Sequence, residues 1–503
     1  MLDISEIRQI EFDVLVIGGG GAGLCAAITA TKESKKVGLI CKSLLGKAHT
    51  VMAEGGMAAA LGNVDNRDHW KIHFRDTMRG GKMLNVWRMA ELHARHAADR
   101  VRELEQWGAV FDRTKEGLIN QRNFGGHRYP RLAHVGDRTG LEMIRTLQDY
   151  GIHKDIDIHM ECTALDILKD ESGKVAGVVC MYRETGEFII FKTKSLILAT
   201  GGGGKAWEIT SNSWEYTGDG YAMAYEAGAE LMDLEFNQFH PTCLYHPHAG
   251  SFLISEAVRG EGGVLRLPNG ERFMHRFDDR KELAPRDVVA RAIDFEMKRL
   301  GADFVTIDIS HRSQQFILDH FPTIADKCFS LGMDMTKEAI PVVPAAHYAC
   351  GGVGVNLNGH TSLKRLYAIG EVACTGVHGS NRLASTSLLE SLVWGYNAGK
   401  DASIHQEGDN YFPNIHPWII EKKTIDPALI YQDWLSIKHT MWNYVGLVRT
   451  RPRLYRAQKI LRNLQNDIEG FYQKTKLSPK IISLRNGIQT ANAIVLSAIE
   501  AQH

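Results

Sequence analysis

Glycine dominates one short segment near the N-terminus of this chain, with the spacing of a phosphate-binding turn. Residues 18–23 read Gly-Gly-Gly-Gly-Ala-Gly, directly after the apolar residues 14–17 and directly before the expected start of a helix at Leu24. In the G-x-G-x-x-G pattern the first glycine permits a tight turn, the second lets the backbone touch a pyrophosphate, and the third lets helix and strand pack closely. The helix N-terminus then presents unpaired amides to the phosphates. The segment predicts a dinucleotide site built on Gly18, Gly20, Gly21 and Gly23.

Two other segments depart from the usual nucleotide patterns. The second strand of a dinucleotide fold normally ends in an acid that binds a ribose, whereas residues 40–43 here read Ile-Cys-Lys-Ser. The glycine run 201–204, followed by Lys205, is not a P-loop. Ala199 stands at the first glycine position of that motif, and Ala206 stands where Ser or Thr would hold magnesium. We interpret the run as a second turn that faces the nucleotide.

The histidines and cysteines do not predict a metal centre. His240, His246 and His248 lie close together in the sequence. Pro247 separates two of them and no convincing fourth ligand is near, so we disfavour a metal site. The cysteines are spread singly without a C-x-x-C pair, which argues against a disulfide framework and against zinc or an iron–sulfur cluster held by this chain. We interpret all eight as buried thiols in a reducing cytosol.

The composition is that of an ordinary globular protein. The chain has 503 residues with 59 basic and 59 acidic side chains, a hydrophobic fraction of 44% and a charged fraction of 23%. These values exclude low-complexity disorder, and the charge balance excludes a basic body that would bind nucleic acid. Residues 14–31 are uncharged and long enough to span a membrane. Their five glycines and the acidic flank before them speak against a span or a secretory signal. We expect a cytoplasmic protein.

The order of apolar runs predicts an α/β fold of roughly three domains. Strand-like runs alternate with helical periodicity in the first 400 residues, and the C-terminal part is helical in pattern. The expected strands are 14–17, 37–40, 175–179, 188–191, 195–199 and 366–369. The expected helices are 24–31, 85–107 and 285–299, followed by a loop-like stretch at 402–427 and an all-helical final region.

A series of motifs resembles the flavoprotein family of succinate dehydrogenase, fumarate reductase and L-aspartate oxidase. The resemblance covers nearly the whole chain, and this family also lacks the ribose acid at the second strand. The motifs are ATGG (199–202), TGDG (217–220), QFHPT (238–242), EAVRGEGG (256–263), GERFM (270–274), PRD (285–287), AHY (346–348), AIGE (368–371) and NRLAS (381–385).

The two parts of the chain resemble different members of this family. The first half is more similar to a succinate dehydrogenase flavoprotein, through AHT (48–50), AEGG (53–56) and QRNFGGH (121–127). From about residue 230 onward the chain is more similar to L-aspartate oxidase, through ELAPRD (282–287), VPAAHY (343–348) and HTMWNYVG (439–446).

The resemblance implies three domains. These are a Rossmann-like FAD-binding domain at 1–238 and 343–402, an inserted α+β capping domain at 239–342, and a C-terminal helical domain at 403–503. It places the FAD against Lys42, His49, Thr50, Gly55, Gly56, Asp219, Glu371, Ser387 and Leu388. It places a dicarboxylate pocket at His240, Thr242, Ser255, Glu256, His347 and Arg382, with Arg286 as catalytic acid/base. A substrate with two anionic ends needs cationic or donor groups at both, and a guanidinium binds a carboxylate through two hydrogen bonds.

The function favoured by the resemblance is FAD-dependent oxidation of L-aspartate to iminoaspartate for pyridine-nucleotide (NAD) synthesis. Hydride would pass from the substrate's C2 to flavin N5, and O2 or fumarate would reoxidise the flavin. The alternative is a flavoprotein that interconverts succinate and fumarate, and only that alternative implies an iron–sulfur partner chain. A flavin-binding protein without catalysis would keep the glycine motifs but lose the pocket residues, all of which are present.

Two residues separate these alternatives. His49 stands where dehydrogenases and reductases of the family bond a histidine to the flavin, so it predicts either a covalent FAD or a histidine that only hydrogen-bonds near the ring. Phe124 stands where family oxidases carry a glutamate, and the ammonium of aspartate needs a compensating acid in a closed pocket. We therefore expect weak aspartate binding, with fumarate or succinate bound comparably or better.

Overall fold

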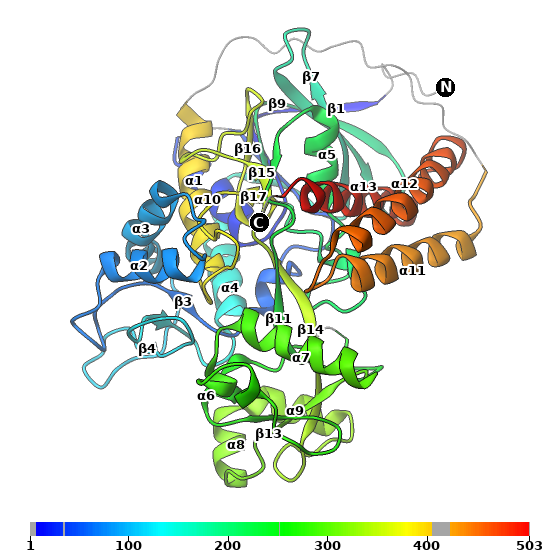
Figure 1. The fold of residues 1–503 in the computed structure, drawn as a ribbon. Helices are drawn as coiled ribbons and strands as arrows, with labels where there is room; N and C mark the ends of the chain where they lie inside the picture. The colour runs from blue at the N-terminus through cyan, green and yellow to red at the C-terminus, as the bar shows by residue number, and fades with distance from the viewer. Residues whose placement is uncertain (1–6, 34–35, 251, 405–422, 502–503) are drawn as a thin grey trace.

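The centre of the molecule is a seven-stranded mixed sheet (Figure 1). The computed structural model describes residues 7–33, 36–250, 252–404 and 423–501. The strands run in the order β6 (Ile156–His159), β2 (Val37–Ile40), β1 (Arg8–Ile17), β9 (Phe188–Leu198), β8 (Val175–Tyr182) and β7 (Cys162–Lys169), and β16 (Leu366–Ala368) also pairs with β9. Parallel strands covered on both faces read as continuous apolar runs, which is why the sequence predicted β2 with its observed bounds. The predicted α/β fold is confirmed.

Strand β9 is continuous, whereas the sequence predicted two strands separated by polar residues. Those polar residues pair with acids of the neighbouring strand β1. Lys192 Nζ lies 3.6 Å from Glu11 Oε1, directly across the ladder. Lys194 Nζ lies 2.7 Å from Asp13 Oδ1. Because these acids satisfy the lysines, the ladder runs on without a turn, and the predicted break is wrong.

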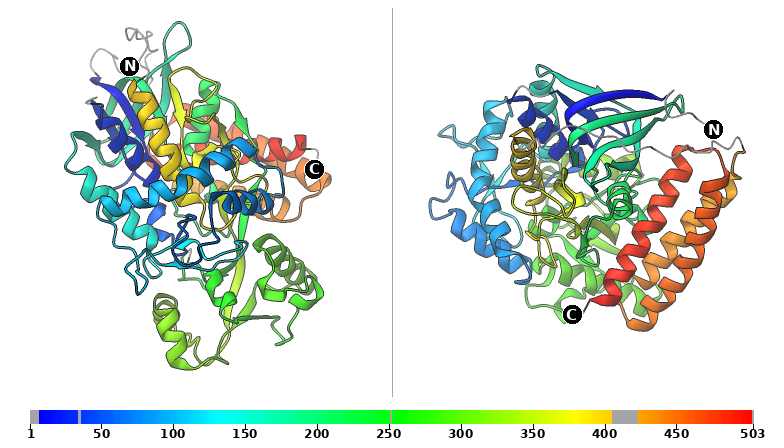
Figure 2. Two further views of the ribbon diagram at one scale, coloured as in Figure 1. Left: turned by 90° about the vertical axis from the view of Figure 1, so that its left-hand side faces the viewer. Right: turned by 90° about the horizontal axis from the view of Figure 1, so that it is seen from above.

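The two faces of the sheet carry separate cores, because successive side chains of a strand point in opposite directions. Leu15 and Ile17 of β1 pack with helix α5 (Asp219–Ala227) and with the C-terminal helices. Val14 and Val16 pack with α1 (Gly21–Thr31) and α10 (Ser387–Ile404) on the other face. The view from above in Figure 2 shows the C-terminal helices and α1 on opposite sides of the molecule.

A second sheet forms a cap below the central sheet (Figure 1). Its strands run in the order β11 (Asn237–Leu244), β14 (Ile340–Ala349), β13 (Val305–Asp308) and β12 (Val264–Arg266). It packs with helices α6 (Glu256–Gly260), α7 (Arg286–Leu300), α8 (Gln314–His320) and α9 (Pro322–Ser330). The boundaries expected at 238/239 and 342/343 fall inside β11 and β14. The cap is therefore joined to the rest through two paired strands, a stiffer connection than two loops.

Shorter elements complete the fold. The helices among them are α2 (Trp70–Gly80), α3 (Trp87–Gln106) and α4 (Thr139–Gly151). Two small sheets are formed by β3 (Met57–Ala58), β5 (Leu132–Ala133) and β4 (Gln121–Arg122), and by β10 (Leu231–Met232), β15 (Gly352–Gly354) and β17 (Ala373–Cys374). Helices α3 and α7 lie within two residues of the predicted bounds.

Three long helices form the C-terminal region, as the apolar periodicity predicts. They are α11 (Pro427–Tyr444), α12 (Arg451–Lys474) and α13 (Pro479–Glu500). Most of the loop-like stretch expected at 402–427 lies outside the described residues. Within the described part of the chain, no helix is long and apolar enough to cross a membrane. All eight cysteines are free and buried.

We predict that Gly399→Ala destabilises the protein although alanine favours helices. A Cβ at Gly399 of α10 would lie 2.4 Å from the carbonyl oxygen of Ala26 in α1, so the two helices would have to separate. Overpacking of this kind costs about 1–3 kcal/mol. Gly470 in α12 is the matched control, because a Cβ there meets no described atom within 4 Å, and alanine should stabilise that helix by about 0.5–1 kcal/mol. Thermal unfolding should show opposite shifts; equal shifts would contradict this account of the α1–α10 contact.

Candidate active site

A cavity lies at the carboxyl edge of the central sheet, where the ends of β1, β2, β9 and β16 meet the cap. In open α/β sheets ligands bind outside the carboxyl ends of the strands. The cavity encloses about 1770 Å³, its open mouth included. Every site residue named from the sequence lines it except Gly23 and Thr242.

The glycine turn after β1 forms one wall of the cavity. Gly18 has a φ of +117°, and a Cβ there would lie 2.1 Å from the carbonyl oxygen of Ala199. Gly23 does not face the cavity; its Cβ would lie 1.8 Å from the carbonyl oxygen of Gly18. That contact matches the role of the third glycine, which is close packing rather than ligand contact. The N-terminus of α1 is left to face the cavity, with the amide of Gly21 donating to Thr50 Oγ1 at 3.3 Å.

A second helix N-terminus reaches the same cavity. Ser387 and Leu388 are the first residues of α10 and both line the cavity. The preceding turn is held by the hydroxyl of Thr386, which donates to the carbonyl of Leu383 at 2.6 Å. Ser385, with a φ of +63°, completes that turn. Helix N-termini carry partial positive charge, so α1 and α10 together favour an anionic or electron-rich ligand.

An acid from α5 takes the place of the one missing at the end of β2. Lys42 Nζ lies 2.8 Å from Asp219 Oδ2, and both residues line the cavity. Burial alone would raise the pKa of Asp219, but Lys42 and the hydroxyl and amide donors of Thr217 and Asn486 outweigh burial and lower it. The carboxylate is therefore ionised at the place where a dinucleotide fold usually has its ribose-binding acid.

Glu371 is the second acid on this wall. Its Oε1 accepts from the backbone amide of Ala349 at 3.0 Å. Burial raises the pKa of Glu371 to about 7, against the opposing effects of the Ala349 amide and Arg382. A Cβ at Gly202 would lie 2.5 Å from Oε1, so the glycine run 201–204 is needed for Glu371 to approach. Gly201 lines the cavity, which agrees with the interpretation of the run as a turn facing the ligand.

His49 is a neutral imidazole at the cavity wall. Its Nε2 lies 3.2 Å from Asn212 Nδ2, and its ring packs edge-on against Tyr216 with centroids 4.9 Å apart. Burial lowers the pKa of His49 to about 4. Its Nδ1 has no hydrogen-bond partner among the described residues. An uncharged ring agrees with either role expected of His49, so the covalent attachment stays a prediction.

Arg122 holds the turn that contains Gly55 and Gly56, a role that sequence reasoning missed. Its Nη2 donates to the carbonyl of Glu54 at 2.7 Å and to that of Gly55 at 2.8 Å. Burial raises the pKa of Glu54 to about 8, with Asp137 adding to the effect. Arg122 belongs to the QRNFGGH motif (121–127), but its partners lie 67 and 68 residues earlier in the chain, so the motif does not reveal this role.

The residues of this part of the cavity fit an extended flavin dinucleotide. Two helix N-termini, a glycine cradle and an ionised acid lie along one connected space. Buried polar atoms without a hydrogen-bond partner in the described chain also belong to lining residues, namely Thr200 Oγ1 and His49 Nδ1. Buried polar groups normally have a hydrogen-bond partner, so a polar ligand in the cavity would supply the partners that these atoms lack.

A linked set of charged side chains lies at the cap end of the cavity. Arg286, the first residue of α7, donates through Nε to Glu256 Oε2 in a short contact. Arg259 Nη2 lies 3.6 Å from the other oxygen of Glu256, and its Nη1 donates to the carbonyl of Glu282 at 2.8 Å. Burial raises the pKa of Glu256, but Arg286 and Arg259 outweigh burial and the net shift is downward. Glu256 therefore stays ionised between two guanidinium groups.

Two histidines face each other across the same end of the cavity, with ring centroids 5.3 Å apart. The amide of Thr242 donates to His240 Nδ1 at 3.2 Å, so the proton of a neutral His240 ring sits on Nε2. This Nε2 has no partner in the described chain, and His240 lines the cavity. Burial and the nearby arginines lower the pKa of both His240 and His347. His347 Nδ1 lies 2.7 Å from the hydroxyl of Ser211, which fixes the ring.

Arg382 is supported by a buried acid that the sequence did not identify. Its guanidinium lies 4.5 Å from the ring centroid of Tyr348, and its Nη1 donates to Ser387 Oγ at 3.0 Å. The hydroxyl of Tyr348 donates to Glu390 Oε2 at 2.5 Å, and His378 Nε2 lies 2.8 Å from the same oxygen. Burial raises the pKa of Glu390, but His378 and these donors lower it overall. Glu390 thus fixes the ring on which Arg382 rests.

Two residues expected to bind substrate have other structural tasks. The hydroxyl of Thr242 donates to the carbonyl of Ile254 at 2.8 Å, and Thr242 does not line the cavity. Its backbone amide instead orients His240. Ser255 lines the cavity and also caps α6, where its hydroxyl accepts from the amide of Ala257 at 3.3 Å. No group of three or more potential metal ligands occurs among the described residues, His246 and His248 included.

Phe124 lies beside Arg286, with the guanidinium carbon 5.8 Å from the ring centroid. The loop that carries it is anchored at His127, whose Nε2 lies 2.8 Å from the carbonyl of Ala384. Arg131, fully buried, lies 3.5 Å from the other ring nitrogen of His127 and forms ion pairs with Asp68 at 2.7 Å and Asp76 at 2.9 Å. The phenyl ring therefore sits on a fixed loop at the substrate end.

Comparisons with known proteins agree with this site. The FAD binding domain family model matches residues 13–388. An L-aspartate oxidase of Pseudomonas aeruginosa is 43% identical over 98% of this chain and 94% of its own length. A fumarate reductase (CoM/CoB) chain of Methanothermobacter marburgensis is 38% identical over 98% of this chain and 93% of its own. The structure of Mycobacterium smegmatis Sdh1 in complex with UQ1 superimposes with a TM-score of 0.87 at 40% identity, covering 99% of this chain and 88% of that one.

The matched family model spans both helix N-termini, both glycine turns and the cap with its arginines. The full-length similarity extends this agreement through the C-terminal helices. The residues that line the cavity thus lie almost entirely within the matched part of the chain. The chain belongs to the family of FAD-dependent oxidoreductases that comprises L-aspartate oxidases and the flavoproteins of succinate dehydrogenase and fumarate reductase.

Proposed function

We propose that this protein oxidises L-aspartate to iminoaspartate, the reaction that supplies pyridine-nucleotide synthesis. The observation that carries the proposal is the pairing of Arg286 and Arg382 with the neutral rings of His240 and His347 at the cap end of an FAD cavity. The 43% identity to an L-aspartate oxidase over nearly the full length supports the choice of substrate. When bound, FAD accepts hydride from the substrate's C2 and passes the electrons to O2 or fumarate.

Substrate binding would rest on charge. Arg286, Arg382 and Arg259 lie at the cap end, where the ionised carboxylate of Glu256 contacts Arg286 and Arg259. A C4 substrate brings two carboxylates, which a pair of guanidinium groups can each hold through two hydrogen bonds. The Nε2–H of His240 offers one further donor with no partner in the described chain. These donors would fix the substrate's carbon chain across the end of the cavity.

Arg286 would manage the proton at the reacting carbon. A free guanidinium is effectively always protonated, so Arg286 acts as a base only in surroundings that disfavour its charge. The Glu256 carboxylate between Arg286 and Arg259 would hold the guanidinium in place during that step.

The second candidate is interconversion of succinate and fumarate, and Phe124 favours it. A phenyl ring attracts an ammonium by about 0.5–2 kcal/mol, less than an ionised carboxylate at the same place would. His49, where dehydrogenases and reductases of the family bond the flavin, points the same way. Only under this alternative would an iron–sulfur partner chain be required.

Anaerobic addition of L-aspartate to the purified yellow protein tests the proposed function directly. We expect the flavin absorbance to bleach, because electrons leave the substrate and have no acceptor beyond the flavin. Succinate in a parallel sample measures the alternative. Bleaching by succinate alone would select the second candidate, and no bleaching by either compound would remove both.

Arg286→Leu should retain yellow flavin and lose turnover by several orders of magnitude. Leucine keeps much of the side-chain volume but can neither hold a carboxylate nor move a proton. Arg291→Leu on the same helix is the matched control, because Arg291 is 52% exposed and pairs only with the neighbouring Asp287 among the ion pairs described. Steady-state rates together with flavin content decide the matter; substantial activity in Arg286→Leu would remove this residue from the mechanism.

Phe124→Glu should raise kcat/KM for aspartate by about tenfold and weaken succinate or fumarate binding. The new carboxylate would oppose the substrate's ammonium, whereas it would repel a dicarboxylate that lacks one. Phe124→Gln is the control for size and polarity without charge. If the unmutated protein already oxidises aspartate efficiently and Phe124→Glu changes nothing, then specificity lies in the cap and not in this loop.

A further inference from the structure

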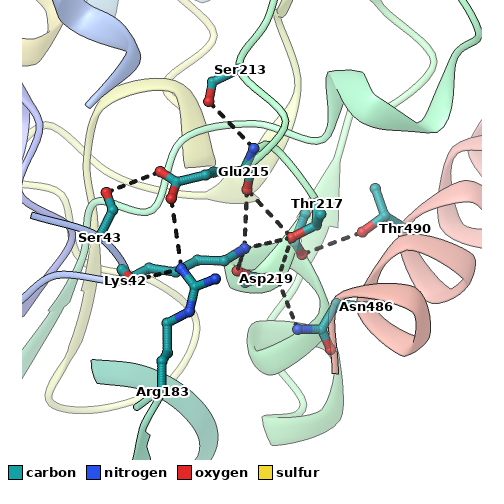
Figure 3. A network of polar contacts seen from close by, with 10 residues as sticks. Lys42, Ser43, Arg183, Ser213, Glu215, Thr217, Asp219, Asn486 and Thr490 are labelled. Atoms are coloured by element: carbon teal, nitrogen blue, oxygen red, sulfur yellow. Dashed lines mark hydrogen bonds and ion pairs between the residues drawn. The ribbon is translucent and has the colours of Figure 1, made fainter. Parts of the chain in front are cut away.

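The C-terminal helix α13 belongs to a polar network with Lys42 and Asp219, two residues of the cavity wall (Figure 3). Asn486 Nδ2 donates to Asp219 Oδ1 at 2.8 Å, across 267 residues of sequence. One turn later, the hydroxyl of Thr490 donates to the carbonyl of Gly218 at 3.3 Å. Both α13 side chains are buried. A helix outside the matched FAD-binding model therefore contacts a wall of the dinucleotide site.

Asn486 completes the hydrogen-bonding shell of the Asp219 carboxylate. Lys42 Nζ lies 2.8 Å from Oδ2, and the hydroxyl of Thr217 donates to Oδ1 at 2.7 Å. Asn486 is the third donor and comes from the opposite side, as Figure 3 shows. Three donors from three segments fix both the charge and the direction of this carboxylate.

The glycine turns behind Asp219 are shaped to fit α13. A Cβ at Gly218 would lie 2.0 Å from Thr490 Oγ1, and one at Gly203 would lie 2.7 Å from Thr490 Cγ2. Gly203 follows the residues that face the ligand, and Gly218 caps α5 in a left-handed conformation. Contacts this close leave no room for the helix to shift without moving the turns.

Helix α13 is also tied to α5, the helix that begins with Asp219. Arg485, next to Asn486, pairs with Glu226 at the other end of α5 and lies 3.0 Å from Glu469 of α12. Gln489 Nε2 donates to the same Glu226 at 2.9 Å. The carboxylate and the helix that carries it are thus held by α13 at both ends.

We propose that Asn486 is a positioning residue of the cofactor site, and that docking of α13 and binding of FAD stabilise each other through the Asp219 carboxylate. Asp219 lines the cavity at the end of β2, where a carboxylate accepts hydrogen bonds from ribose hydroxyls. Asn486 aims that carboxylate. Coupling between two binding events is reciprocal, so bound FAD must also tighten α13. The inference requires only that FAD binds in this cavity, and it holds for either substrate.

The test compares Asn486→Ala with Asn492→Ala. Asn492 is a buried asparagine on the same helix whose Nδ2 donates to Gln465 Oε1 at 2.8 Å, within the C-terminal helices. All proteins carry His49→Ser, so that no bond to the flavin hides its affinity. We expect Asn486→Ala to bind FAD about ten- to a hundredfold more weakly, the range for one hydrogen bond to a charged group. Asn492→Ala should bind FAD as its parent does, even if its flavin-free form unfolds at a lower temperature.

Asn486→Asp tests the proposal through the pH dependence of FAD affinity, which would not change if Asn486 only stabilised the fold. The new carboxyl faces Asp219 at nearly the same size, so FAD affinity should fall further at pH 8 and recover toward pH 5, as the two acids come to share a proton. Lys42 contacts Asp219 directly. Burial lowers the pKa of Lys205, which also acts on Asp219, to about 8, so the parent protein is measured at both pH values as the control for the charge of Lys205. Hydrogen exchange of α13 should slow when FAD binds the parent and slow less in Asn486→Ala.

Equal FAD affinity in Asn486→Ala and its parent would overturn the proposal. So would an equal loss in Asn492→Ala, which would indicate that any damage to the helix releases FAD. Failure of the parent itself to bind FAD would instead contradict the placement of the cofactor, a different result from failure of the coupling.

Discussion

Buried positive charge at the cap end of the cavity is the constraint on which the rest of the site depends. Arg259 and Arg382 are buried and Arg286 is 11% exposed, and among the described ion pairs Glu256 is the carboxylate that contacts two of the three, Arg259 and Arg286. Uncompensated buried charge is costly. The site therefore keeps its histidines neutral, because a protonated His240 or His347 would add to the excess. The remaining positive charge of the arginines would attract a doubly negative substrate, and the fold positions these arginines before the substrate binds.

The same constraint explains why several acids lie one layer behind the cavity wall. Glu390 accepts from the hydroxyl of Tyr348, the residue on whose ring Arg382 packs, and no described ion pair joins Glu390 to Arg382. Had Glu390 contacted Arg382 directly, it would have competed with the substrate's carboxylate. Because Glu390 acts through Tyr348, it supports the position of Arg382 and leaves the guanidinium donors of Arg382 for the ligand. The backbone carbonyl of Glu282 holds Arg259 in place, since it accepts a hydrogen bond from Arg259.

The sequence predicts those features of the site that are built from neighbouring residues, and it does not predict contacts between residues far apart in the chain. The turn at 18–23 is contiguous, so the strand before it and the helix after it were predictable, although β1 begins at Arg8 and α1 at Gly21, earlier than expected. The roles of Arg122, Asn486 and Glu390 were not predictable, because each acts through partners far away in the chain. The prediction split strand β9 at its polar lysines. These lysines pair with acids of β1, and the sequence alone does not show that β1 lies beside β9.

Substrate choice depends on whether the ammonium of aspartate finds an ionised acid. Both oxygens of Glu256 already face guanidinium groups. Burial raises the pKa of Glu54 to about 8, so this carboxyl is mostly neutral near pH 7. The ring of Phe124 already lies beside Arg286, whose positive charge opposes a second cation there. A dicarboxylate would therefore meet three guanidinium groups opposed by Glu256, whereas aspartate would also bring its ammonium against the cations that hold its carboxylates.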